Sequence, residues 1–87
     1  MNLEEELREE TKKWLEKLKE KLREIDGDKR FVENIVAYSK DCEYFLEKSD
    51  LIRAFECVVW AWAWLEIGLE VKKVAIGTAH ADKSQNR

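Results

Sequence analysis

The chain has 87 residues, of which 45% are hydrophobic and 40% are charged, and it contains no proline and only three glycines. This length and composition predict one helical-bundle domain and argue against a disordered chain. The net charge is −3 and acidic and basic residues are interspersed, a pattern that argues against binding to nucleic acid or to anionic lipid.

The first predicted helix spans about residues 3–25. Asn2 is a suitable N-cap, and three glutamates follow in the first turn, where the helix dipole favours anions. The apolar seam of this helix comprises Leu7, Thr11, Trp14, Leu15, Leu18, Leu22 and Ile25. The helix is predicted to end at Asp26-Gly27-Asp28, because Gly27 can adopt the left-handed C-cap conformation and Asp28 can cap the next helix.

The second predicted helix spans about residues 29–48 and the third about residues 50–76, with a break at Ser49-Asp50. Steps of four and three residues define the apolar stripe of the second helix, which comprises Phe31, Ile35, Tyr38, Cys42 and Phe45, with Leu46 beside them. The core stripe of the third helix comprises Leu51, Phe55, Val58, Trp62, Leu65 and Leu69, with Ala54 and Ala61 beside them.

Short connections between the three helices force neighbouring helices to run antiparallel. The predicted fold class is therefore all-α, an antiparallel up-down-up three-helix bundle. Residues 1–77 are expected to form this single domain, and residues 78–87, which have no apolar period, a flexible C-terminal tail. No segment shows the alternating pattern of a β-strand.

The third helix carries a second apolar stripe, which comprises Trp60, Trp64, Ile67, Val71 and Val74. A domain of this size has little interior for a helix that is apolar around almost its whole circumference. Three interpretations are open: the stripe completes the core against Trp14 and Leu15, forms a symmetric dimer seam, or offers a groove to another protein or an aromatic ligand. The candidate interface residues are Trp60, Trp64, Ile67 and Val71.

Side chains suited to catalysis or metal binding are sparse in this sequence. The single histidine, His80, falls in the predicted tail, and two separated cysteines with one histidine cannot complete a zinc site. There is no glycine-rich phosphate loop and no Glu-x-x-His pair of a di-iron bundle. We therefore predict no catalytic residue, no cofactor and no metal, and hence no enzyme.

Two cysteines and one aspartate have open roles. Cys42 and Cys57 are predicted to lie at matching heights on antiparallel helices, so reduced core thiols and a disulfide are both open. Asp41 is the candidate buried polar residue, on the flank of the second helix's apolar stripe. It either accepts a hydrogen bond from a tryptophan indole or from Arg53, or is a carboxylate with a shifted pKa that awaits a ligand.

Residues 31–69 resemble a known family. The similarity lies in the runs Tyr38-Ser39-Lys40-Asp41-Cys42-Glu43-Tyr44-Phe45-Leu46, Ser49-Asp50, Ala54-Phe55-Glu56 and Trp60-Ala61-Trp62-Ala63-Trp64-Leu65-Glu66-Ile67-Gly68. These runs are similar to the small archaeal proteins catalogued as domain of unknown function 357. The resemblance implies a compact helical bundle with no established activity and no catalytic residues. One departure is Ser49, which stands where a glycine is expected.

A weaker similarity is to HEPN domains, whose nuclease motif has an arginine followed after four to six residues by a histidine. No arginine stands at that distance before His80. The alternative function is therefore a HEPN-like, nucleic-acid-associated or toxin–antitoxin-type partner subunit without its own nuclease motif.

The main prediction is a non-enzymatic helical interaction or oligomerisation module, either a homodimer or bound to a protein partner through the third helix. The acidic N-terminal segment does not resemble a signal peptide, and the longest uncharged run, Cys57 to Leu65, is too short to span a bilayer. We therefore expect a cytoplasmic protein without membrane contact. The dominance of lysine and glutamate among the charges is typical of a thermophile. The sequence leaves open whether the protein binds a small-molecule ligand.

Overall fold

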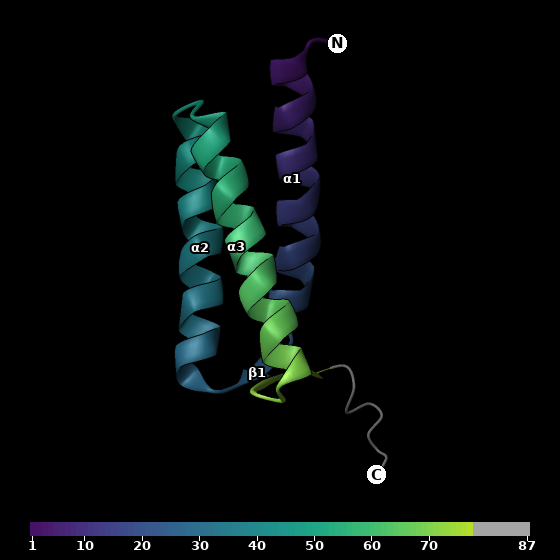
Figure 1. Cartoon of the computed structure of the whole chain (residues 1–87), viewed down its shortest axis with the longest axis vertical. Coiled ribbons are helices and arrows are strands. Elements are labelled where there is room, and N and C mark those ends of the chain that lie inside the picture. Colours follow the sequence, from purple (N-terminus) through teal and green to yellow (C-terminus); the bar gives the residue numbers. More distant parts are fainter. Residues whose placement is uncertain (78–87) are drawn as a thin grey trace.

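A computed structural model describes residues 1–77 as three antiparallel helices in up-down-up order. The helices are α1 (Leu3–Leu22), α2 (Lys29–Glu47) and α3 (Leu51–Glu70), which lie side by side along the long axis of the molecule (Figure 1). The predicted three-helix bundle is therefore confirmed. The predicted tail, residues 78–87, lies outside the described residues.

Helix α1 begins at the residue that the sequence predicts. The Asn2 side chain accepts a hydrogen bond from the Glu5 amide at 2.8 Å, and the Glu5 carboxylate accepts one from the Asn2 amide at 3.0 Å. This reciprocal capping box satisfies two amide groups that an uncapped helix end would leave without a partner. The helix ends at Leu22, three residues earlier than predicted, because the chain leaves it to form a strand.

Two short strands close the end of the bundle at which α3 finishes, so the prediction of a chain without strands was wrong. Strand β1 (Ile25–Gly27) pairs antiparallel with β2 (Val74–Ile76), with Ile25 opposite Ile76 and Gly27 opposite Val74. The Asp28 amide extends this pairing by donating to the Lys73 carbonyl at 2.7 Å. The pair ties the α1–α2 connection to the segment that follows α3.

Helices α2 and α3 end in the same local structure. At the end of α3, Lys72 has a left-handed φ of 61° and the Lys73 amide donates to the Gly68 carbonyl at 2.8 Å. At the end of α2, Ser49 has a φ of 58° and the Asp50 amide donates to the Phe45 carbonyl at 2.9 Å. Both ends are Schellman motifs, which reverse the chain sharply. This reversal ends α3 at Glu70, six residues before the predicted end.

The core depends on small side chains between α2 and α3. Ala54, Ala61 and Gly68 are buried at seven-residue intervals along α3, together with Leu51, Val58 and Leu65. They face the buried residues Ile35, Ser39 and Cys42 of α2. A Cβ at Gly68 would lie 3.0 Å from a ring carbon of Phe31, which shows how closely the elements approach. Of the predicted stripe, Leu51, Val58 and Leu65 are buried, whereas Phe55 and Trp62 are half-buried and Leu69 is exposed. The contact face of α3 is therefore centred on its small residues, beside the predicted stripe.

Candidate interaction surface

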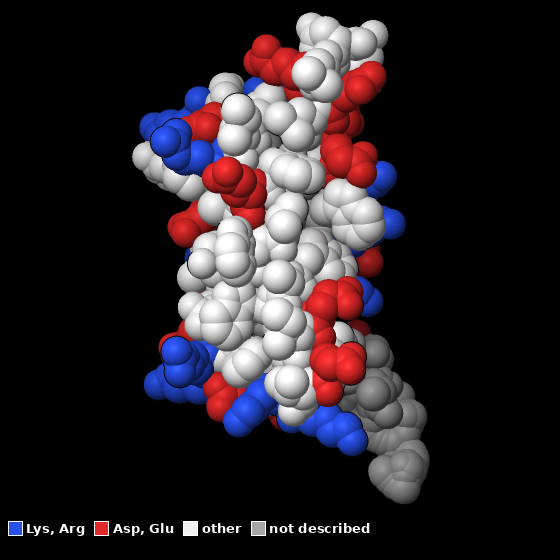
Figure 2. All heavy atoms as spheres, viewed as in Figure 1, with Lys and Arg blue, Asp and Glu red and all other residues white. Residues whose placement is uncertain are grey.

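The side of α3 that faces away from the core is largely apolar. Its most exposed apolar residues are Ile52 (69% exposed), Trp60 (57%), Ile67 (56%), Val71 (53%) and Val59 (48%). Figure 2 shows this surface as a largely uncharged band along α3, with acidic groups on it and beside it and basic groups near its ends. We call these five residues, together with Ala63, the α3 face.

The two predicted interface tryptophans rest against α2 and not against α1. The Trp60 ring stacks on Tyr38 at a centroid distance of 6.3 Å and an interplanar angle of 20°. The Trp64 ring meets Phe31 edge-on at 5.0 Å and is half-buried. The interpretation in which Trp60 and Trp64 complete the core against Trp14 and Leu15 is therefore wrong, whereas Val74 leaves the predicted stripe and is buried.

A hollow lies on each side of the α3 face. The α2–α3 hollow has a volume of about 300 Å³ and is lined by Phe31, Trp60, Ala63, Trp64 and Ile67. The α1–α3 hollow has a volume of about 310 Å³ and is lined by Trp14, Phe55, Val58, Val59 and Trp62, with Glu10 and Glu66 also contributing. Three of the four predicted interface residues thus line one hollow, and Val71 lies beyond it at the end of α3.

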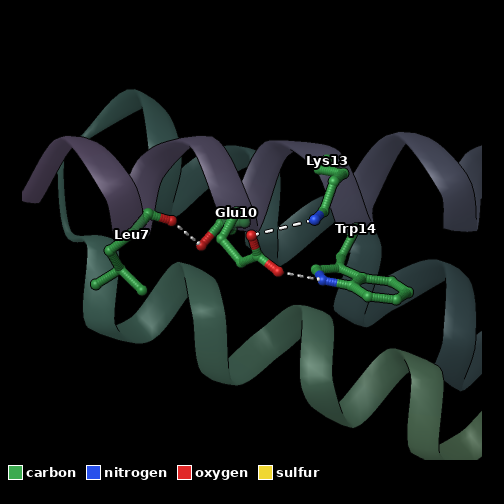
Figure 3. A network of polar contacts seen from close by, with 5 residues as sticks. Leu7, Glu10, Lys13 and Trp14 are labelled. Carbon is green, nitrogen blue, oxygen red and sulfur yellow. Dashed lines mark hydrogen bonds and ion pairs between the residues drawn. The ribbon is translucent and has the colours of Figure 1, made fainter. Parts of the chain in front are cut away.

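A polar network within α1 lies at the edge of the α1–α3 hollow (Figure 3), and one further hydrogen bond, from Trp62, joins α1 to α3. The Trp14 indole donates to Glu10 at 2.8 Å, and Lys13 forms an ion pair with Glu10 at 3.2 Å. The hydrogen bond from Trp14, followed by that from Lys13, lowers the pKa of the Glu10 carboxyl. The Trp62 indole donates to the Trp14 carbonyl at 3.1 Å, and the two rings meet edge-on at 5.7 Å. Both indoles therefore have hydrogen-bond partners.

The prediction that Asp41 is buried was wrong, because its side chain is exposed on α2. The expected donors are engaged elsewhere: Arg53 contacts Asp50 at 2.7 Å, and the Trp14 and Trp62 indoles bind Glu10 and the Trp14 carbonyl. Helix α2 instead turns Ser39 and Cys42 toward α3, where small side chains allow close packing. Asp41 consequently neither locks α2 against α3 nor lies in a closed ligand pocket.

Both cysteines are free thiols in the structure. Cys42 is buried, and this burial, with a smaller contribution from Cys57, raises the pKa of its thiol to about 12. Cys57 is half-buried, and burial followed by the nearby Asp41 carboxylate raises its pKa as well. Since the thiolate is the reactive form, neither cysteine is an activated nucleophile near neutral pH.

We expect the two thiols to react with a disulfide reagent at different rates. Cys57 should be modified slowly in the folded protein, and Cys42 only when the chain unfolds, because it is both inaccessible and protonated. Mass spectrometry of the modified native chain would measure this, with Cys57→Ser as the matched variant that isolates Cys42. Equal rates at both positions in the folded protein would contradict the packing described for Cys42.

The described residues hold neither a metal cluster nor a membrane span. Within residues 1–77, no group of three or more histidine, cysteine, aspartate or glutamate side chains is placed to hold a metal ion. None of the helices in this part of the chain combines the length and the apolar character that crossing a membrane requires. His80, the only histidine, lies outside the described residues.

Comparison with known proteins identifies the family of this helical bundle. Residues 2–74 match the model of the family described as "Protein of unknown function (DUF357)", and the chain belongs to this family. The structure is similar to the crystal structure of protein AF1782 from Archaeoglobus fulgidus, of the same family, with a TM-score of 0.84. The two chains are 67% identical, and the match covers 86% of this chain and 99% of that chain. A search of curated proteins found no match.

The resemblance read from residues 31–69 is therefore confirmed, and it extends over helix α1 as well. The family description assigns no activity to its members. Any statement of function consequently depends on the surface of the molecule.

Proposed function

We propose that this protein is a non-enzymatic helical interaction module that buries the α3 face against another polypeptide. The observation that carries the proposal is the exposure of Trp60 and Ile67 on a helix whose opposite side already forms the core. Aromatic and large aliphatic residues around a hollow are typical anchors of protein interfaces. The cytoplasmic location expected from the sequence remains part of this proposal.

The size of the α3 face indicates an interaction of moderate strength. With side-chain areas of roughly 150–250 Å² for the large residues, the exposed fractions amount to on the order of 500 Å², near the upper end for a patch on a monomer. At about 25 cal/mol per Å², burying this surface contributes roughly 12 kcal/mol as an upper bound. Association costs about 4–15 kcal/mol in lost freedom. The free energy from apolar burial is therefore comparable with the cost of association and does not by itself determine how tightly a given partner binds.

The alternative of a nucleic-acid-associated subunit has less support. The α3 face is bordered by acidic groups (Figure 2), and an acidic border repels a phosphate backbone. A salt-dependent shift of labelled RNA on adding the purified protein would reverse this preference.

We expect a double variant, Trp60→Glu with Ile67→Glu, to keep its fold. Both side chains are more than half exposed, so the free energy of unfolding should fall by no more than roughly 1–2 kcal/mol. Circular dichroism and thermal melting would measure this. Leu65→Glu, on the buried side of the same helix, is the control that should unfold the chain.

The same variants test the proposed function through mass in solution. Light scattering over a range of concentrations would show whether the native chain self-associates and whether the double variant abolishes this. If the double variant stays folded, the fold does not need the α3 face, which is then available for binding. A native dimer would show that the partner is a second copy, and a native monomer would point to a different protein. Unfolding of the double variant would assign the α3 face to the fold and remove the support for this function.

A further inference from the structure

The charges along the α3 face distinguish between the partners that it can bind. Three glutamates, Glu56, Glu66 and Glu70, are exposed on α3 beside the apolar residues. Within residues 1–77, none of the three forms an ion pair or a side-chain hydrogen bond. The nearest basic residue on the helix, Arg53, is already paired with Asp50 at 2.7 Å. The α3 face is therefore flanked by three carboxylates that form no ion pair within the described part of the chain.

A second copy of the chain fits this charge pattern poorly. Ala63 is the smallest side chain of the α3 face and is the point at which another helix can approach most closely. If two α3 helices cross antiparallel there, Glu56 of one copy lies opposite Glu70 of the other, because both are seven residues from Ala63. A parallel arrangement places each glutamate near its own counterpart. Like charges face each other in either case, which disfavours self-association.

We propose that the occupant of the α3 face is an amphipathic helix of another protein that carries basic residues beside its apolar stripe. This inference rests on the proposed function and names the chemistry of the partner. Two hollows flank the middle of the face, one on the α1 side and one on the α2 side, and can receive large apolar side chains. An apolar stripe with flanking lysines or arginines complements both the hollows and the acidic border.

The glutamate spacing defines the spacing of the basic residues in the partner. Glu56 and Glu66 are ten residues apart, and Glu66 and Glu70 are four residues apart. These separations correspond to about 15 Å and 6 Å along a helix. A partner helix that runs parallel to α3 would carry basic residues at positions i, i+10 and i+14, and one that runs antiparallel at i, i+4 and i+14.

The test uses two synthetic helical peptides of identical composition. The first has a leucine stripe flanked by lysines at i, i+4 and i+14, and the second has the same three lysines on the face opposite the leucines. Fluorescence anisotropy of the labelled peptides would measure binding to the full chain. We expect the first peptide to bind at least roughly tenfold more tightly, and its affinity to fall as salt is added.

Charge-reversal variants connect this binding to the α3 face. The double variant Glu66→Lys with Glu70→Lys should bind the first peptide roughly tenfold or more less tightly than the native chain does. The control variant Glu9→Lys with Glu20→Lys changes the net charge by the same amount, but at exposed positions on α1. It should change the affinity for the first peptide by less than about twofold. Equal binding of both peptides, no binding of either, or unchanged binding by the α3 variant would overturn the inference.

A native dimer that Trp60→Glu with Ile67→Glu dissociates would also overturn the inference, since a second copy would then occupy the α3 face. The proposed interaction function would survive that result, and it fails only if the double variant unfolds. The two failures are therefore distinguishable.

Discussion

Replacing Leu65 by alanine is expected to lower the free energy of unfolding by about 2–5 kcal/mol. Leu65 is completely buried in the middle of α3, where it contacts the cluster of core residues drawn from all three helices. Removing its side chain forfeits apolar burial and leaves a cavity that rigid neighbouring helices fill only in part. For a domain of this size, the midpoint of thermal unfolding should fall by roughly 10–30 °C.

Ile67→Ala is the matched control, because it removes a similar aliphatic side chain from the same helix at an exposed position. Its effect on stability should stay within about 1 kcal/mol. Chemical denaturation of the native chain and both variants would measure the difference. Similar losses for the two variants would mean that the two sides of α3 do not divide into core and surface as described.

Replacing Gly27 by alanine is the second change with a large expected effect, a loss of roughly 2–4 kcal/mol in the free energy of unfolding. Gly27 has a φ of 145°, a conformation that residues with a Cβ rarely adopt. A Cβ at this position would overlap the Lys73 carbonyl oxygen and lie 2.7 Å from the Val74 Cα. Since that carbonyl accepts the Asp28 amide, relief of the overlap would break the hydrogen bond that extends the strand pair.

Asp26→Ala provides the control for Gly27→Ala, since Asp26 is exposed in the same strand. It should change stability by no more than about 0.5 kcal/mol. Thermal melting of the two variants, followed by circular dichroism, would compare them directly. If Gly27→Ala unfolds at the same temperature as the native chain, the close approach of β1 and β2 is not a source of stability.

The helices could be predicted because their signals are local. Asn2, Asp28 and Asp50 accept hydrogen bonds from the first turns of α1, α2 and α3, as capping residues do. The turn between α2 and α3 forms at the predicted break, and Ser49, which stands where a glycine is expected, adopts a left-handed φ of 58° there. The strands could not be predicted, because three residues carry no readable period and the pairing joins segments far apart in the sequence.

The orientation of α3 was only partly predictable from its apolar residues. Almost every side of the helix is apolar, so periodicity alone does not say which side faces α2. The informative signal was the spacing of Ala54, Ala61 and Gly68, whose small side chains permit close packing and displace Trp60 and Trp64 to the flank. The four interface candidates remain predictions about binding, whereas Asp41, predicted to be a buried polar residue on the flank of the α2 stripe, is exposed.

The strand pair also determines how the molecule opens. Because β1 and β2 join the two ends of the α2–α3 hairpin, that hairpin is held as a closed unit, whereas α1 contacts it less extensively than α2 and α3 contact each other. Local unfolding should therefore begin with α1, whose amide hydrogens should exchange with solvent before those of α3. Such an opening would remove Trp14 from Trp62 and dismantle the α1–α3 hollow. A partner seated in that hollow would consequently slow the exchange of α1, even at amides that it does not touch.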